Sequence, residues 1–262
     1  MKINIKKILT QVSILTLTFI VVACSSTTGP TAKVNDEGEL KKAIINLKKG
    51  KVYELTYASL KKGGMKVLKN KYFPKAMPIV GEYGGKMLGM FKVVANTGGK
   101  MKTPQVIALF EWESIKQMKN LHNDSRMGPL GKIRDGQIIF FRQSYYSVKQ
   151  DKEITFRSDK TYEFFNAWLR PNEQDSLDKY FVVSLDAKKR HGPPIFRASL
   201  SPFKTSLQGK HILKPHMAGI VEWPDTQTYY DLIKDEEFAT KAQPLLDRAV
   251  YRLDMLHTKF VF

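Results

Sequence analysis

The sequence predicts an α+β protein built from two tandem repeats of strand, helix, strand, strand, helix, strand that pack sheet to sheet. Three observations predict this fold. The same landmarks recur in the same order in both halves of the chain, strand-like apolar runs alternate with helical patterns, and no cysteine follows Cys24 to form a disulfide. Roughly 220 residues follow the N-terminal segment, which is enough for two small domains with cores of their own.

The landmarks define the repeat. A Tyr-Glu pair is followed 18 or 17 residues later by Lys-Tyr-Phe; a Glu-Trp pair comes next, and an aspartate lies 12 residues beyond each tryptophan. The first copy contains Tyr53-Glu54, Lys71-Tyr72-Phe73, Glu111-Trp112 and Asp124, and the second contains Tyr162-Glu163, Lys179-Tyr180-Phe181, Glu222-Trp223 and Asp235. Such order and spacing over both halves indicate duplication.

The N-terminal segment is typical of export. Three lysines precede an apolar run that ends at Cys24, which predicts a signal peptide over residues 1–23. Val21-Val22-Ala23-Cys24 resembles the bacterial lipobox, which implies lipidation of Cys24; an ordinary signal peptide with an incidental cysteine is the alternative. Residues 24–50 are predicted to be the lipidated cysteine and a flexible tether.

The first domain, residues 51–150, contains four strand-like runs and helices in the gaps between them. We expect strands at Val52–Leu60, Lys86–Ala95, Val106–Trp112 and Gln137–Val148. Met65, Leu68, Tyr72 and Phe73 recur at helical spacing. The helical run from Ser114 to Asp135 is expected to break near Gly128-Pro129.

The second domain, residues 160–262, repeats this order. Its predicted strands are Tyr162–Arg170, Ile195–Phe203, Met217–Trp223 and Tyr251–Phe262. Its predicted helices are Glu173–Lys189 and Asp225–Val250, with Asp225 as the N-cap and a break near Pro244. This order is the ferredoxin-like arrangement, in which one sheet face stays apolar after both helices cover the other. Two copies bury those faces against each other as an intrachain α+β barrel.

The second copy carries a family likeness. Ile220-Val221-Glu222-Trp223-Pro224-Asp225, Asp235-Glu236-Glu237-Phe238, Leu245 and Arg248 resemble the pattern of an uncharacterised family in the dimeric α+β barrel superfamily, related to antibiotic-biosynthesis monooxygenase and NIPSNAP-type domains. In the first copy Phe110-Glu111-Trp112, Asp124 and Arg134 fit, but Ser125-Arg126-Met127 replaces the acidic-aromatic segment. The resemblance implies a pocket between sheet and helices, and it fixes no activity because relatives differ in chemistry.

The acids of the Glu-Trp pairs are the candidate catalytic residues. Adjacent strand residues point to opposite faces, so one member of each pair should face the cleft between sheet and helices. A half-buried Glu111 or Glu222 could act as an acid or base together with Arg248. The alternative is a structural ion pair of these acids with Arg134 or Arg248.

The candidate ligand-binding residues come from the same segments. Trp112, Trp223 and Tyr229 either line a pocket or belong to the core. His122 and His216 either ligate a haem or lie at the surface. The five histidines lack the spacing of a zinc site, so no metal is expected, and no cofactor is expected apart from haem as an alternative. Arg134 is the remaining candidate ligand-binding residue.

The net charge and the predicted location limit the possible binding partners. The formal net charge is +18, and it falls to +15 once the three lysines of the signal peptide are removed. An exported, lipid-anchored protein is not expected to meet nucleic acid; it would lie in the cell envelope, at the outer membrane facing the periplasm in a Gram-negative source. Its basic surface is either merely solvated or attracts anionic envelope polymers.

No motif for nucleophilic or phosphate chemistry is present. The sequence therefore favours a non-enzymatic lipoprotein that binds a small ligand in a cleft. A cofactor-free or haem-dependent monooxygenase-like oxidoreductase and a basic envelope interaction module are the alternatives.

Overall fold

The structure, a computed structural model, describes residues 40–203 and 210–262. The predicted signal peptide, Cys24 and most of the tether lie outside these residues. Within them, no helix has both the length and the apolar character needed to cross a membrane.

Each repeat forms four strands and a layer of helices, as predicted. The first repeat comprises β2 (Val52–Leu60), α2 (Gly64–Val67), the π-helical η1 (Leu68–Tyr72), α3 (Phe73–Glu82), β3 (Lys86–Gly98), β4 (Val106–Trp112), α4 (Ile115–His122), α5 (Met127–Asp135) and β5 (Ile138–Ser147). The second comprises β7 (Thr161–Leu169), α6 (Gln174–Arg190), β8 (Ile195–Pro202), β9 (Met217–Trp223), α7 (Thr226–Lys234), η2 (Phe238–Ala242), α8 (Gln243–Ala249) and β10 (Val250–Phe260).

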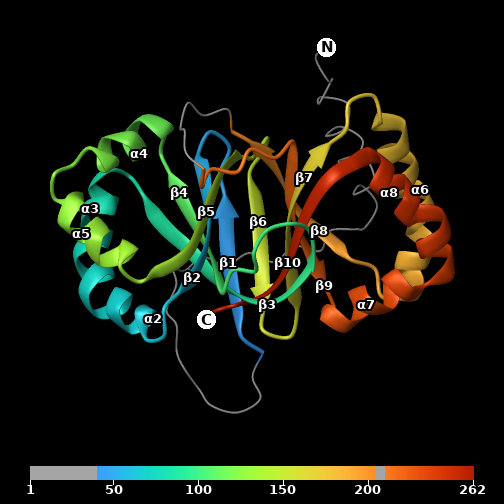
Figure 1. Ribbon diagram of the computed structural model, residues 1–262, viewed down its shortest axis with the longest axis horizontal. Coiled ribbons are helices and arrows are strands. Elements are labelled where there is room, and N and C mark those ends of the chain that lie inside the picture. The colour runs from blue at the N-terminus through green and yellow to red at the C-terminus, as the bar shows by residue number, and fades with distance from the viewer. Residues whose placement is uncertain (1–39, 204–209) are drawn as a thin grey trace, which may run out of the picture.

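The eight strands close into one antiparallel barrel. Their order is β10-β3-β4-β2-β5-β8-β9-β7, so each repeat supplies four neighbouring strands and the repeats meet at the β10–β3 and β5–β8 seams. The helices of the first repeat cover one side of the barrel and those of the second cover the opposite side (Figure 1). The predicted α+β fold is confirmed, and the inner faces of the two sheets bury one common core.

The two seams differ in length. The β10–β3 seam joins residues from Met255↔Gly98 to Phe260↔Phe91, whereas β5 and β8 pair at Tyr146↔Pro202 and Ser147↔Ser201. Beyond this short pairing, segment 211–213 lies along β5, with hydrogen bonds from Gln143 N to His211 O (2.9 Å) and from Leu213 N to Gln143 O (2.7 Å). This segment, with its flanking residues Lys210 and Lys214, is called the strap, and it occupies the edge of β5 that β8 leaves unpaired.

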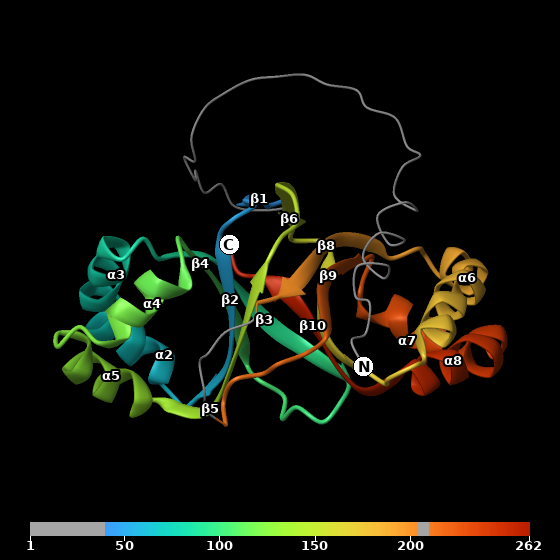
Figure 2. The same ribbon diagram turned by 90° about the horizontal axis from the view of Figure 1, so that it is seen from above.

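A two-stranded sheet closes one end of the barrel. It consists of β1 (Lys42–Leu47) and β6 (Lys152–Arg157), and it lies on the opposite side of the barrel from the loop that follows β3 (Figure 2). The tether prediction for residues 24–50 is wrong over β1 because Ile45 and Leu47 lie on one face of this strand and are buried in the barrel core. We call β1 and β6 the plug.

The repeated Tyr-Glu tyrosines hold the plug. The Tyr53 hydroxyl accepts from Lys48 N, just after β1, and the Tyr162 hydroxyl accepts from Arg157 N (2.7 Å), at the end of β6. Both tyrosines are fully buried on the inner face of the barrel. One duplicated residue therefore fixes each strand of the plug.

The helix breaks fall elsewhere than predicted. Pro129 lies inside α5, and the chain breaks between α4 and α5 at residues 123–126. In the second repeat the break follows Lys234, and Pro244 sits in the first turn of α8, which continues directly from the π-helical η2. The predicted N-cap is confirmed because the Asp225 side chain accepts from Thr228 N at 2.7 Å.

Loop 99–105 after β3 depends on a buried carboxylate. Asp254, 1% exposed, accepts from Lys100 N (2.9 Å) and Met101 N (3.2 Å), and Gly99 has a φ of 106°. A Cβ at Gly99 would lie 2.3 Å from Asp254 Oδ1 and 2.4 Å from Leu253 O. The left-handed backbone at residue 99 and its close approach to Leu253 and Asp254 thus both require glycine.

We expect Gly99→Ala to lower the free energy of unfolding by about 1–3 kcal/mol, because the left-handed backbone and the contact with Asp254 both become strained. Gly128→Ala is the matched control: Gly128 is inside α5, its added Cβ would meet nothing within 4 Å, and alanine favours the helix by up to about 1 kcal/mol. Urea denaturation measures both. Equal midpoints for the two variants would contradict the role of Gly99.

Candidate functional site

The Glu-Trp pairs place their two side chains on opposite faces of the barrel wall, as predicted. Trp112 and Trp223 face the helices and belong to the clusters beneath them. Glu111 and Glu222 face inward, near the plug, and both are about 5% exposed. The acids predicted to be catalytic therefore do not line the clefts between sheet and helices.

These acids have partners other than those the sequence suggested. Glu111 Oε1 lies 2.9 Å from Lys86 Nζ, and Glu111 Oε2 accepts from the Tyr53 hydroxyl at 3.1 Å. Glu222 Oε2 lies 2.8 Å from Arg197 Nη2. The inward acids are thus paired near the plug.

The predicted arginines lie elsewhere. Arg134 pairs with Asp135 (2.8 Å) and Arg248 with Glu173 (2.9 Å), and the Arg248 side chain is 70% exposed. The suggested ion pairs of Glu111 or Glu222 with Arg134 or Arg248 are wrong, because these arginines stand on or beside the helical layers while the acids point into the barrel. The structure does not bring Glu222 and Arg248 together.

The sequence interpretation missed the acids that do face the helices. Glu54 Oε2 and Glu163 Oε2 each accept from the indole N–H of the repeat's tryptophan, Trp112 or Trp223, at 3.1 Å. Both carboxylates are about 6% exposed. The repeated Tyr-Glu pair could have indicated these acids, but the sequence interpretation used it only as evidence of duplication. A buried carboxylate needs such donors, so the hydrogen-bonded Glu and Trp form a unit that both copies share.

The two clefts differ in the other partners of these acids. In the first repeat Glu54 Oε1 accepts from Thr56 (2.7 Å) and from Gln143 (2.6 Å). In the second, His257 Nε2 lies 3.2 Å from Glu163 Oε2, and the imidazole is fully buried. The Nδ1 atom of His257 has no hydrogen-bond partner among the described residues.

The second cleft also holds aromatic rings and a lysine. Tyr229 packs edge-on against His257, with ring centroids 5.1 Å apart, and burial raises the pKa of its hydroxyl. Lys188 Nζ lies 4.6 Å from the centroid of the Tyr180 ring and donates to Ser184 Oγ at 2.8 Å. Burial lowers the pKa of Lys188 to about 8. This cleft therefore concentrates titratable groups that could hold or move a proton.

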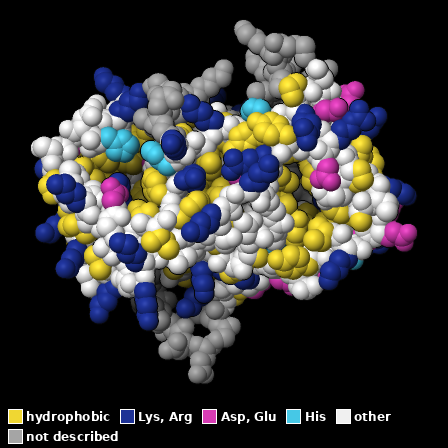
Figure 3. Space-filling model, viewed as in Figure 1, with side chains coloured by type: hydrophobic (Ala, Val, Ile, Leu, Met, Phe, Trp, Pro, Cys, Tyr) yellow, Lys and Arg dark blue, Asp and Glu magenta, His cyan; other side chains and the backbone are white. Residues whose placement is uncertain are grey.

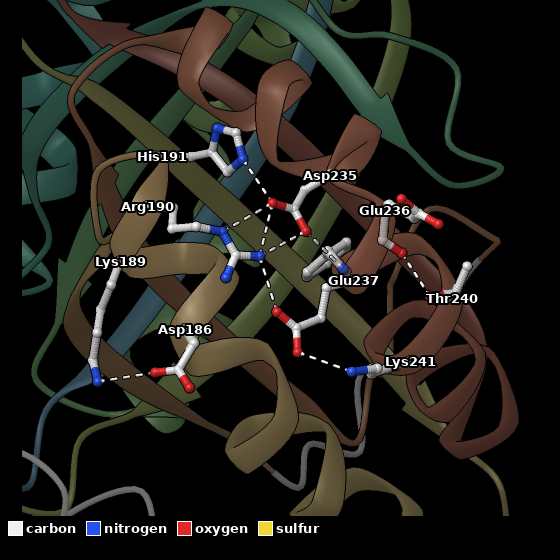
Figure 4. Close-up of polar contacts among 10 residues, drawn as sticks. Asp186, Lys189, Arg190, His191, Asp235, Glu236, Glu237, Thr240 and Lys241 are labelled. Atoms are coloured by element: carbon white, nitrogen blue, oxygen red, sulfur yellow. Dashed lines mark hydrogen bonds and ion pairs between the residues drawn. The ribbon is translucent and has the colours of Figure 1, made fainter.

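A polar clamp joins the helices of the second repeat at the predicted acidic segment. Asp235 accepts from Phe238 N (3.0 Å) and from Arg190 Nη2 (2.9 Å), and it lies 3.0 Å from His191 Nε2. Arg190 also pairs with Glu237, as Figure 4 shows. These donors hold the pKa of Asp235 far below its usual range, chiefly through the backbone N–H of Phe238.

The first repeat has its own version of the clamp. Asp124 accepts from Arg126 and from the Tyr83 hydroxyl (3.0 Å), and Arg126 reaches Glu82 at 2.6 Å. Both duplicated aspartates thus tie the segment after a short helix to the end of the preceding long helix. They are structural, and neither lines a cavity described below.

A cavity of about 480 Å³ lies at the barrel mouth opposite the plug. Its wall comes from β5, β7, β10, loop 99–105 and the strap. It is lined by Lys100, Met101, Lys102, Phe140, Arg142, Trp168, Lys210, Ile212, Leu213, Lys214 and Arg252. None of the residues predicted from sequence as site residues is in this wall. We call it the mouth cavity.

The comparisons with known proteins show the fold. No family model and no curated protein matches the sequence. The structure is similar to an anthrone oxidase-like protein, with a TM-score of 0.50, 14% identity, and coverage of 84% of this chain and 95% of that one. The chain thus shares an α+β barrel fold with that protein.

Two other solved structures are less similar in fold. A chlorite dismutase variant from Candidatus Nitrospira defluvii has a TM-score of 0.48 and 8% identity, with 81% of this chain and 92% of that chain covered. A heme-binding protein from Thermus thermophilus has a TM-score of 0.44 and 8% identity, with 84% and 94% covered. These scores carry no functional argument for this chain.

The two histidines predicted as haem ligands lie in different places in the fold. His216 Nδ1 accepts from Leu169 N at 3.0 Å, and His122 lies in the last turn of α4, where burial lowers its pKa. No histidine lines the mouth cavity or the smaller cavity beside Asn172. The described residues also contain no group of three or more His, Cys, Asp or Glu that could hold a metal ion.

We expect the stability of the protein to rise between about pH 8 and pH 10, relative to Lys188→Met. The folded-state pKa of Lys188, about 8, is below its unfolded value of 10.5, so the unfolded chain binds an extra proton in that window. Denaturant unfolding at several pH values measures the difference. Lys189→Met, its exposed neighbour on α6, should keep the slope of the natural chain; the same slope in Lys188→Met would contradict the assignment.

Proposed function

We propose that the protein is a lipid-anchored component of the cell envelope that binds a small anionic ligand in the mouth cavity. One observation carries the proposal: the cavity wall contains six cationic side chains and no acidic one. Its volume, about 480 Å³, is within the range of small-molecule sites. Apolar side chains complete the wall, which supports a ligand that also has an organic part.

Electrostatics supports this site over the clefts. Lys and Arg side chains are spread over the face of the molecule shown in Figure 3, with few acidic side chains among them. A concave wall of one charge concentrates the field and raises the local concentration of counter-ions. The site predicted between sheet and helices stays a prediction. Its acids, Glu54 and Glu163, are already hydrogen-bonded to Trp112 and Trp223, which leaves them less free to bind a ligand.

The enzyme alternative is supported by the second cleft alone. Glu163, His257 and Lys188 could serve acid and base steps of the kind that a cofactor-free oxidoreductase needs. The fold of the anthrone oxidase-like protein agrees with that alternative. The ligand-binding function is preferred because the mouth cavity offers space.

Calorimetric titration of the purified full chain with sulfate, citrate, benzoate and haemin tests ligand binding. We expect at least one organic anion to bind and to stabilise the protein by about 2–3 kcal/mol at a hundredfold excess over its Kd. Lys102→Ala/Lys214→Ala should weaken that binding at least tenfold. A haemin complex with a shifted Soret band and no binding of other anions would overturn the proposal in favour of the haem alternative.

The anchor has a test of its own. We expect the natural chain to sediment with membranes and Cys24→Ser to appear in the soluble fraction, because Cys24 would carry the acyl chains. Ser25→Ala, next to the predicted lipidation site, is the control and should remain with membranes. Retention in washed membranes of Cys24→Ser that has lost its signal peptide would contradict lipid anchoring.

A further inference from the structure

Most cations of the mouth cavity have no acidic partner among the described residues. Two arginines outside the cavity are matched by contrast: Arg126 contacts Glu82 and Asp124, and Arg190 contacts Asp235 and Glu237. The four lysines of the cavity wall form no ion pair with any described residue. They are Lys100, Lys102, Lys210 and Lys214. Their mutual repulsion is relieved when an anion enters.

The two arginines of the wall are held in place. Arg252 Nη2 donates to Asp254 Oδ2 at 2.6 Å, and its guanidinium lies 4.1 Å from the centroid of the Trp168 ring. Arg142 Nη1 donates to Phe141 O at 2.8 Å, and its guanidinium lies 5.2 Å from the Phe140 ring. Pre-positioned guanidinium groups lose little freedom when they bind an oxyanion.

The lysines stand on two anchored segments. Asp254 holds loop 99–105 through the backbone of Lys100 and Met101, and the Asn96 side chain donates to Met101 O at 3.0 Å. The strap that bears Lys210 and Lys214 is bonded to Gln143 of β5. The wall is therefore a built site in which backbone contacts set the positions of the cations, although each lysine side chain is itself exposed.

The balance of charge selects the class of anion. Six cations face the cavity, and Asp254 compensates Arg252, which leaves five positive charges. A phosphate monoester carries about −1.5 to −2 at pH 7, so two phosphates neutralise roughly three to four of them. Two carboxylates would neutralise two. Lysine binds phosphate as a point charge, while the fixed arginines suit bidentate contacts with its oxygens.

We infer that the mouth cavity binds an organic bisphosphate, with its phosphates on the lysines and arginines and its organic part against Met101, Ile212 and Leu213. This inference rests on the proposed function and narrows its ligand. The bisphosphate comes either from a soluble compound or from a phosphorylated lipid headgroup, because both present the same chemistry to the wall.

Titration of the purified full chain with three probes tests the class. We expect fructose 1,6-bisphosphate to bind at least tenfold more tightly than fructose 6-phosphate and than citrate at equal ionic strength. Lys102→Ala/Lys214→Ala and Arg142→Met should each weaken the bisphosphate at least tenfold. Lys75→Ala/Lys179→Ala, with exposed lysines on α3 and α6, removes the same charge away from the cavity and should change affinity less than twofold.

Binding to vesicles distinguishes a lipid headgroup from a soluble bisphosphate. If the natural ligand is a headgroup, vesicles containing diphosphoryl lipid A, whose headgroup carries two phosphate monoesters, should bind the Cys24→Ser chain at least tenfold better than phosphatidylcholine vesicles, and Lys102→Ala/Lys214→Ala should abolish the gain. Binding of either the soluble bisphosphate or diphosphoryl lipid A through the cavity supports the inference. A citrate affinity equal to or above that of both bisphosphates overturns the bisphosphate class and leaves anion binding intact, whereas no binding of any anion overturns the proposed function as well.

Discussion

The alternation of Tyr and Glu along β2 and β7 is the constraint on which the rest of the structure depends. In a closed barrel, adjacent residues of a strand face the common core and the helices in turn. Tyr53 and Tyr162 therefore point inward and hold the plug, while Glu54 and Glu163 point outward and accept the indole N–H groups. The buried carboxylates need those donors, which ties β2 to β4 and β7 to β9.

This frame allowed the clefts of the two copies to diverge. Tyr145 and His257 occupy equivalent places, each directly across from the outward Glu of its repeat. Six residues after the tryptophan the first copy has a methionine and the second has Tyr229. Lys188 likewise lies eight residues after Tyr180, where the first copy has a valine after Tyr72. The first cleft thus surrounds Glu54 with Thr56, Gln143 and Tyr145, and the second surrounds Glu163 with His257, Tyr229 and Lys188.

The mouth cavity follows from unequal seams. At one seam β10 and β3 pair from Met255↔Gly98 to Phe260↔Phe91. At the other, β5 and β8 separate after a short pairing, and the strap takes the free edge of β5. Phe140 and Arg142 of β5 then border open space instead of a neighbouring strand. Two similar halves close the barrel, and the departure from symmetry at one seam lies beside the cavity.

The sequence by itself determined the repeat, the strands of each copy, the α+β architecture and the N-cap at Asp225. These features depend on local periodicity and spacing, which can be read separately in each copy. It predicted that Glu and Trp of each pair face opposite sides, but which side each takes depends on how the barrel curves. Only the tertiary structure decided the partners and the cavity. Glu111 meets Lys86 across neighbouring strands, and the cavity wall joins residues from Lys100 to Arg252. Lysines scattered along a basic chain look alike until packing gathers some of them around one space.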